Sequence, residues 1–208
     1  MIKNPKRMSI KFQYNKTSLQ QLNKQLQIRE RALPTLKNKE SALRMEVEMA
    51  RKKLKETGDL LEKKIRDQEQ DLGLWNEFDA GLVEVEDVHI GYRKLAGVSI
   101  PELREVDFNT HEFNVFLRPK WFLEGIEHLE ELMKLNIEME VGQQKLELLE
   151  YARKKTTQKV NLYEKVQIPG YQDAIRKIKR FLEDEENLTK AAQKIVKSRQ
   201  QQKMETAL

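Results

Sequence analysis

The side chains that could bind a metal or transfer a proton are concentrated in the middle of the chain. All three histidines lie there, close to several carboxylates: His89, His111 and His128, with Glu86, Asp87 and Glu112 nearby. Imidazole and carboxylate groups are common protein ligands of zinc. Their spacing here matches no ligand pattern of that kind, so we interpret these residues as solvated surface groups.

Other potentially reactive residues also have a simpler interpretation. Carboxylate pairs such as Glu130 and Glu131, or the run 183–186, have the spacing of a solvated helix face, and the methionines suit a helix seam because their flexible side chains fill irregular gaps. The chain has no cysteine and no G-x-x-x-x-G-K-[ST] loop to hold a phosphate. The sequence therefore predicts no catalytic residue, no cofactor and no metal site.

The composition indicates long helices. Of 208 residues, 35% are charged and 38% hydrophobic, with eight glycines and five prolines. Few helix breakers and many charged residues favour long helices that bury a narrow apolar stripe. There is no run of eighteen apolar residues to cross a membrane, and the start MIKNPKRMSIKF lacks the apolar core of a signal peptide. We expect a cytoplasmic protein.

Charge is distributed unevenly along the chain. The net charge is +8 for residues 1–76, −10 for residues 77–150 and +7 for residues 151–208. Blocks of opposite sign attract different partners. We therefore expect the basic ends and the acidic middle to bind different surfaces.

Residues 17–75 follow a coiled-coil pattern. Mostly apolar side chains recur with 3-4 spacing in two rows: Leu19, Leu26, Leu33, Glu40, Val47, Leu54 and Leu61; and Leu22, Arg29, Leu36, Leu43, Ala50, Thr57 and Lys64. This pattern predicts one helix of about 60 residues, roughly 90 Å long at 1.5 Å per residue. Polar residues in the seams, such as Arg29 and Glu40 here and Arg153 and Thr156 later, lower stability but can fix the register.

Residues 77–120 interrupt the coiled-coil pattern and predict a small acidic head with a β-hairpin. Apolar and polar residues alternate from Val83 to Ile90, which is typical of a strand. We expect two further short strands, at residues 98–100 before Pro101 and at residues 106–108. The aromatic residues that flank this segment are expected to fill the base of the head: Trp75, Trp121 and Phe122.

The remaining residues, 121–208, again have a helical pattern, apart from Pro169 and Gly170. Proline lacks a backbone donor and clashes with the carbonyl four residues back, and glycine is the next poorest helix former. Because the pattern continues on both sides, we expect a kink near 169–170 within a helix. The predicted fold class is mainly α: a long antiparallel two-helix coiled coil with a small β-hairpin-containing middle segment.

In this antiparallel pairing, Pro34 falls opposite residues 163–175, a range that contains Pro169. Both prolines would then disturb their helices at about the same level. The pairing therefore predicts that both helices bend there.

The most distinctive segment is TTQKVNLYEKVQIPGYQDAIRKIKRFLEDEEN, with its V-N-L-Y-E-x-V-x-I-P core. It resembles the D subunit of V-type and archaeal-type rotary ATPases, in its bacterial branch. KTSLQQLNKQLQIRERALPTLKNKESAL, LAGVSIPELREVDF and RPKWFLEGIEHLEEL resemble other parts of that family in the same order. The signature positions carried over by this resemblance are Thr157, Val160, Asn161, Leu162, Tyr163, Glu164, Val166, Ile168, Pro169 and Ile175, with Pro34 from the first helix.

The resemblance implies a rotor shaft that catalyses no reaction. Family members form a coiled coil in the cavity of a catalytic head built from A-type and B-type subunits. They bind the F subunit of the stalk, and a ring-linking subunit (C or d) connects them to the membrane ring. The implied role is to transmit torque that couples ATP synthesis or hydrolysis to ion transport, with no nucleic acid, no membrane insertion and no homo-oligomer.

Two charged surfaces are candidates for partner contacts. We expect a basic tip to lie inside the catalytic head as a weak electrostatic bearing: Lys3, Lys6, Arg7, Lys11, Lys194, Lys197, Arg199 and Lys203. We expect acidic residues of the hairpin to dock a basic face of a stalk partner: Glu84, Glu86, Asp87, Glu102 and Glu105. Two alternatives remain open, a prefoldin-like coiled-coil chaperone and a basic coiled coil that binds nucleic acid.

Overall fold

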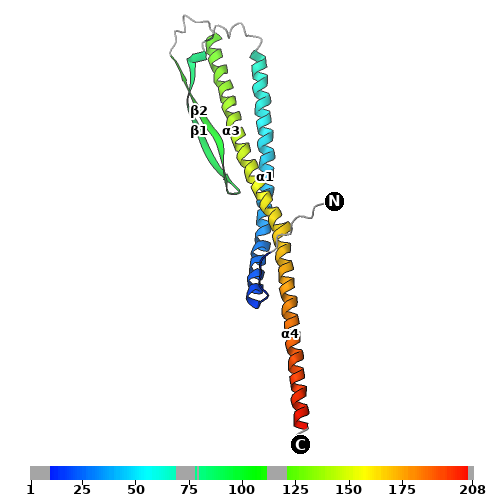
Figure 1. The fold of residues 1–208 in the computed structure, drawn as a ribbon. Coiled ribbons are helices and arrows are strands. Elements are labelled where there is room, and N and C mark those ends of the chain that lie inside the picture. Colours follow the sequence, from blue (N-terminus) through cyan, green and yellow to red (C-terminus); the bar gives the residue numbers. More distant parts are fainter. Residues whose placement is uncertain (1–9, 69–77, 79, 112–120, 206–208) are drawn as a thin grey trace. The chain divides into compact units, whose positions relative to one another are not determined.

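The computed structural model describes residues 10–68, 78, 80–111 and 121–205. Its elements are, in order, α1 (Lys16–Gln68), the 3-10 turn η2 (Ala80–Leu82), β1 (Val83–Leu95), β2 (Val98–Thr110), α3 (Trp121–Asn161), the π-helix η4 (Leu162–Gln167) and α4 (Ile168–Glu205) (Figure 1). The long helices and the antiparallel hairpin confirm the predicted fold class. The segment boundaries predicted at residues 76 and 120 lie outside the described residues, so the three-part division stays a prediction.

The chain forms two compact units, and α1 contributes to both. Residues 1–38 and 157–208 form one unit, which we call the terminal unit. Residues 39–156 form the other, the hairpin unit, which includes the hairpin and parts of α1 and α3.

An asparagine cap starts α1. The backbone N–H of Ser18 donates to Oδ1 of Asn15 at 2.7 Å, which satisfies one of the free N–H groups of the first turn. Farther along, Pro34 lies inside the helix and its side chain is exposed. A proline there removes a single backbone hydrogen bond, and α1 continues for more than thirty residues beyond it.

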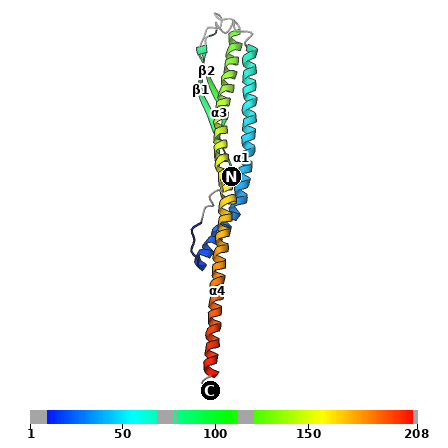
Figure 2. The same cartoon turned by 45° about the vertical axis from the view of Figure 1, so that its right-hand side comes forward.

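The core of the terminal unit is a narrow seam between α1 and α4. Its buried residues are Leu22 of α1 and Ala174, Ile175 and Ile178 of α4, with Ile178 fully buried. Ile10 and Phe12, which precede α1, pack against this seam as well, and Figure 2 shows their segment turning back along the first turns of α1.

The hairpin unit has two small cores, one near each end of the hairpin. Ile100 of β2 is fully buried among Leu43 and Val47 of α1 and Leu149 of α3. The second core lies where β1 and α3 begin, and its buried members are Leu82, Val83, Phe122 and Ile126, with Phe78, Phe108 and Trp121 packed against them. The predicted filling of the hairpin base by Trp121 and Phe122 is therefore confirmed, whereas Trp75 lies outside the described residues.

The hairpin consists of two long strands joined by a two-residue turn. Ala96 and Gly97 both have positive φ, 48° and 84°, as a tight turn matched to strand twist requires. The prediction of a separate third strand at 106–108 was wrong, because residues 98–110 form the single strand β2. Pro101 does not end that strand, since each strand of a two-stranded ribbon has an outer edge where a missing N–H disturbs no ladder bond.

Two bulges interrupt the alternation of the hairpin. Glu86 is the extra residue between the pairs Val85–Phe108 and Asp87–Asp107, and Arg104 is the extra residue on β2. A bulge reverses which face the following side chains occupy. Val85 and Ile90, both of which were assigned to the alternating strand pattern, are 36% and 39% exposed.

Candidate interaction surfaces

Arg29 of α1 connects with the π-helix and the first turn of α4. Its Nε donates to Oε1 of Gln167 at 2.7 Å. The guanidinium carbon lies 4.6 Å from the ring centre of Tyr171 and 5.9 Å from that of Tyr163, both within cation–π range. Nη1 also donates to the carbonyl and Oε1 of Gln25, at 2.9 and 2.7 Å. The planar guanidinium is thus held on several sides.

The π-helix η4 lies immediately before Pro169. In a regular α-helix the ring of Pro169 would clash with the carbonyl of Lys165. Here the N–H of Ile168 instead donates to the carbonyl of Tyr163, five residues back. The wider π turn moves the carbonyls that precede the proline away from its ring. Pro169 itself therefore accounts for the π-helix. Pro169 and Gly170 are themselves helical, and a bend of the helix axis stays a prediction.

Residues on both sides of Pro34 contact this region. Arg29 precedes it and bonds to Gln167, and Lys37 follows it, with Nζ 2.7 Å from Oε1 of Glu164. The part of α1 that contains Pro34 therefore lies beside residues 164–167, which fall within the range 163–175 predicted from the sequence.

The signature residues divide between the interior and the surface of the terminal unit. Val160 and Ile175 are buried, at 9% and 7% exposure. Four others are half-buried: Thr157, Tyr163, Val166 and Ile168. The remaining members are exposed: Asn161, Leu162, Glu164 and Pro169. Ile175 therefore contributes to the seam, whereas the exposed members lie within or close to η4.

The last turns of α4 form an exposed basic helix. Lys194, Lys197 and Arg199 are exposed, as are Leu188, Ile195 and Val196 at 72%, 55% and 53%. Lys203 belongs to α4, whereas Lys3, Lys6 and Arg7 lie outside the described residues. Lys11 lies between Ile10 and Phe12, beside the Ile178 seam, and Ile178 is about 24 Å before Lys194 at 1.5 Å per residue. Lys11 is therefore not placed beside Lys194 at the tip.

Four of the five acidic hairpin residues are exposed, and one is turned inward. Glu84 lies 3.6 Å from His111, and Glu86, Asp87 and Glu105 are also exposed. Glu102 is half-buried instead, accepts a hydrogen bond from Arg93 and forms an ion pair with Lys145. It belongs to the network of charged residues described below.

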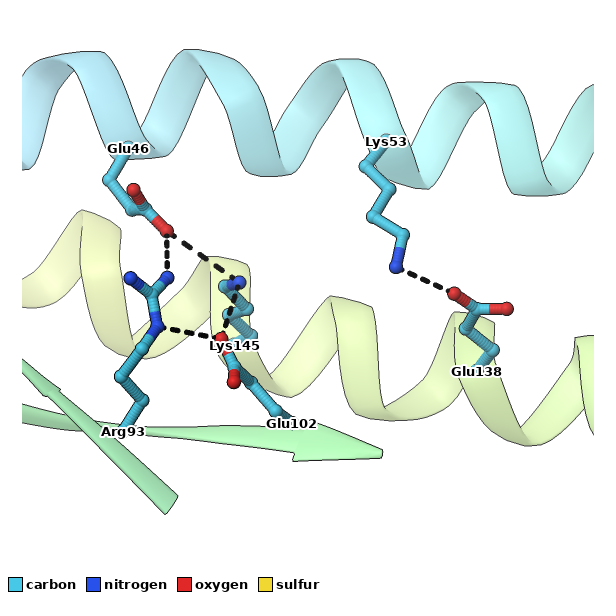
Figure 3. Close-up of polar contacts among 6 residues, drawn as sticks. All are labelled: Glu46, Lys53, Arg93, Glu102, Glu138 and Lys145. Atoms are coloured by element: carbon cyan, nitrogen blue, oxygen red, sulfur yellow. Dashed lines mark hydrogen bonds and ion pairs between the residues drawn. The ribbon is translucent and has the colours of Figure 1, made fainter. Parts of the chain in front are cut away.

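A network of four charged residues joins both helices to the hairpin (Figure 3). Oε1 of Glu46 in α1 lies 2.8 Å from Nη2 of Arg93 in β1 and 3.6 Å from Nζ of Lys145 in α3. Oε1 of Glu102 in β2 lies 2.7 Å from Nε of Arg93 and 3.8 Å from that same Nζ. The hydrogen bond from Arg93 to Glu102 is the main cause that raises the pKa of Arg93 above its ordinary value.

Further ion pairs connect the two helices of the hairpin unit. Nζ of Lys53 lies 2.7 Å from Glu138, as Figure 3 also shows, and Arg51 bonds to Glu150. Lys64 bonds to Glu131, and this hydrogen bond is the main cause that lowers the pKa of Glu131. A carboxylate of the predicted solvated helix face is thus paired across the seam.

Within the described part of the chain, the three histidines form ion pairs or stand apart and do not gather as metal ligands. Nε2 of His89 lies 2.9 Å from Asp107, and Nδ1 lies 3.7 Å from Asp87. The hydrogen bond to Asp107 is the main cause that raises the pKa of His89. Among the residues that the structure describes, no three histidine, aspartate or glutamate side chains come together as metal ligands would.

Sequence reasoning missed Glu46, Arg93 and Lys145. Glu46 directly precedes the seam residue Val47, so a charge beside the seam was a usable signal. Arg93 had no such signal, because its position depends on how the hairpin packs on the helices. Arg29, by contrast, was identified as a polar seam residue, and its contacts to η4 and α4 now explain it.

The described helices include none with a stretch apolar and long enough for a membrane crossing. Paired helices joined by ion pairs, with a hairpin packed on them, define a structural coiled-coil protein. Residues 18–198 match the family described as the D subunit of ATP synthase, and the chain belongs to that family. Membership makes it a central-stalk component of an ATP synthase.

Several relatives resemble it over nearly their full length. The D subunit of the V-type ATP synthase of Borreliella burgdorferi is 28% identical over 192 residues, which cover 90% of this chain and 94% of the relative. The protein of the same name from Chlamydia muridarum is 28% identical over 204 residues, covering 95% and 100%. That of Chlamydia pneumoniae is 26% identical over 185 residues, covering 85% and 87%.

Proposed function

We propose that this chain is the rotating shaft of a V-type ATPase or ATP synthase, transmitting torque between the catalytic head and the membrane ring. The observation that carries the proposal is that charged and polar contacts join α1 to its helical partners in both units, from Arg29 to Lys64. Helices tied together at many points resist being twisted past one another. A shaft that couples ATP synthesis or hydrolysis to ion transport needs this property.

In this role the chain catalyses no reaction and carries no cofactor. The A-type and B-type head subunits would surround it, the F subunit would bind it on the stalk, and a ring-linking subunit would connect it to the membrane. Its position would be cytoplasmic and peripheral to the membrane. Neither the chaperone nor the nucleic-acid alternative gains a supporting observation.

Two surfaces are proposed for partner contacts. The basic end of α4, with Lys194, Lys197, Arg199 and Lys203, would meet acidic or carbonyl-lined surfaces inside the head. The exposure of its described side chains supports this. A polar helical end with little packing of its own is stabilised when another protein surrounds it. The exposed hairpin acids Glu84, Glu86, Asp87 and Glu105 would meet a basic face of a stalk partner.

The test replaces the four basic residues of the α4 end by glutamine. The expected result is unchanged folding of the isolated chain, with a loss of coupling between ATP hydrolysis and ion transport in the assembled complex. Circular dichroism measures the first, and parallel ATPase and ion-uptake assays on membrane vesicles measure the second. The matched control replaces four exposed lysines elsewhere by glutamine: Lys24, Lys39, Lys55 and Lys63.

The outcomes separate the two levels of the proposal. Normal coupling and normal complex yield in the tip variant would refute the electrostatic bearing. Failure of the unmodified chain to co-purify with catalytic head subunits from its native membranes would refute the shaft role itself.

A further inference from the structure

A buried carboxylate lies in a network that connects α1, β1, β2 and α3 within the hairpin unit. Glu46 of α1 is only 8% exposed. It bonds to Arg93 of β1 at 2.8 Å and lies 3.6 Å from Lys145 of α3, and both of these also contact Glu102 of β2 (Figure 3). Burying a charge is unfavourable unless it is paired, so this arrangement needs all of its partners in place.

The apolar seam beside Glu46 specifies the helix register only weakly. Its members are aliphatic and similar in shape: Leu43, Val47 and Ala50 on α1, and Leu146, Leu149 and Ala152 on α3. Apolar burial is non-directional, so a slide of one helical turn would bring similar groups together again. In coiled coils, a polar residue in the seam is a known way to select one register.

We propose that Glu46 locks the axial register of α1 against α3, with the hairpin as a strut between them. A slide of either helix would separate Glu46 from Lys145 while Glu46 remained buried. The hairpin strengthens the lock, because Ile100 is fully buried among Leu43, Val47 and Leu149 and so holds β2 against both helices at one level. With the hairpin held there, Arg93 of β1 lies close enough to bond to Glu46.

The importance of the lock for torque rests on the proposed shaft function. Twisting two wound helices makes them slide along each other, so a fixed register turns a pair of helices into a single stiff element. Glu46, Arg93 and Lys145 are positioning residues in this sense. The register itself, however, is a property of the isolated chain and can be measured without the complex.

The absence of cysteine makes a direct distance measurement possible. Spin labels are attached to the full chain through cysteines introduced at Lys63 of α1 and Lys154 of α3, both exposed residues of the hairpin unit. In antiparallel helices these positions are offset along the axis, so a slide of one turn changes their distance by about 5 Å. Pulsed electron–electron double resonance should give one narrow distribution of the distance between the two labels when no other residue is changed.

Glu46→Gln retains the shape of the side chain and removes the charge. We expect a second distance, shifted by about 5 Å, in up to about 10% of the molecules, the upper end of the usual range for a minor state. Arg93→Gln should produce the same second distance, because it breaks the network from the hairpin side. The matched control is Glu150→Gln, which removes an α1–α3 ion pair that does not include the hairpin, and it should keep the single distance.

A single unchanged distance in both Glu46→Gln and Arg93→Gln would overturn the lock, even if either variant melted at a lower temperature. The same second distance in Glu150→Gln would overturn the special role of Glu46. A slipped register together with normal ATP-driven ion transport would overturn the importance of the lock for torque. The proposed shaft function is tested separately by co-purification of the unmodified chain, so the failures can be told apart.

Discussion

Replacement of Arg29 by methionine should destabilise the terminal unit and release the π-helix. Methionine replaces only the unbranched stem of arginine and has a similar helix propensity, so the change removes the guanidinium with its charge and donors and has little effect on α1 itself. The variant can no longer form the hydrogen bond to Gln167 or the cation–π interactions with Tyr171 and Tyr163. The bonds to Gln25 lie within α1 and are exposed, so we expect little from them.

The size of the effect follows from these interactions. A hydrogen bond from a charged donor contributes about 1.5–3 kcal/mol, and partial exposure of Arg29 places this one at the low end. A cation–π contact in a partly exposed site contributes about 0.5–1 kcal/mol, and the 4.6 Å contact with Tyr171 is the stronger of the two. We therefore expect the free energy of unfolding to fall by about 2 kcal/mol.

Two measurements test this expectation. Urea unfolding followed by circular dichroism gives the change in free energy, and amide hydrogen exchange shows where protection decreases. Exchange should accelerate most in residues 162–168, where the N–H of Ile168 bonds to Tyr163. Arg29→Lys should recover less than half of the stability, because an ammonium group cannot reproduce the planar contacts of a guanidinium.

The control is Arg31→Met, two residues along the same helix. Arg31 is exposed, and a change there should stay within about 0.5 kcal/mol. Equal stability of the Arg29 and Arg31 variants would refute the energetic role of the Arg29 contacts. Unchanged exchange of residues 162–168 in Arg29→Met would refute the claim that Arg29 holds the π-helix.

Two further results are expected in the hairpin. Gly97→Ala should lower hairpin stability by about 1 kcal/mol, because Gly97 has a φ of +84°, which is unfavourable for alanine. No atom lies within 4 Å of the new Cβ, so the cost comes from the backbone alone. Urea unfolding measures the change, and an unchanged midpoint would contradict the turn geometry. Proton NMR should give His89 a pKa above its ordinary 6.5, and Asp107→Asn should lower it, since the bond to Asp107 favours the protonated ring. His89 therefore stabilises the hairpin below about pH 6.5, and this contribution is lost as the pH rises through the raised pKa.

Periodicity predicted the elements well because it reports burial directly. The heptad rows identified Leu22, Leu43 and Val47, which are all buried, and the alternating segment identified the strand that starts at Val83. The prediction of a third strand failed at Pro101, because proline was taken as a strand end although an outer edge tolerates it. Alternation also did not reveal the bulges at Glu86 and Arg104, because the extra residue of a bulge leaves no mark in the apolar pattern.

The candidate surfaces were less predictable, because they depend on contacts between distant segments. The sequence located the irregularity near Pro169, but the form it takes, a π-helix before the proline, depends on backbone bonding. Glu102 resembled its acidic neighbours in the sequence, yet it faces Arg93 and Lys145. Lys11 was assigned to the tip by charge alone. Its neighbours Ile10 and Phe12 pack against the seam that contains Ile178, and so Lys11 lies beside that seam.

The helices of the two units are aligned by polar contacts of different kinds. Each has a seam of small and branched aliphatic residues, which stabilises helix pairing without choosing a register. In the terminal unit the directional contacts come from Arg29, which matches the spacing of Tyr163, Gln167 and Tyr171 at successive turns. In the hairpin unit they come from Glu46, which requires a third element to supply its partner. The residues that decide how these helices align are therefore charged ones, Arg29 within the seam and Glu46 directly beside it.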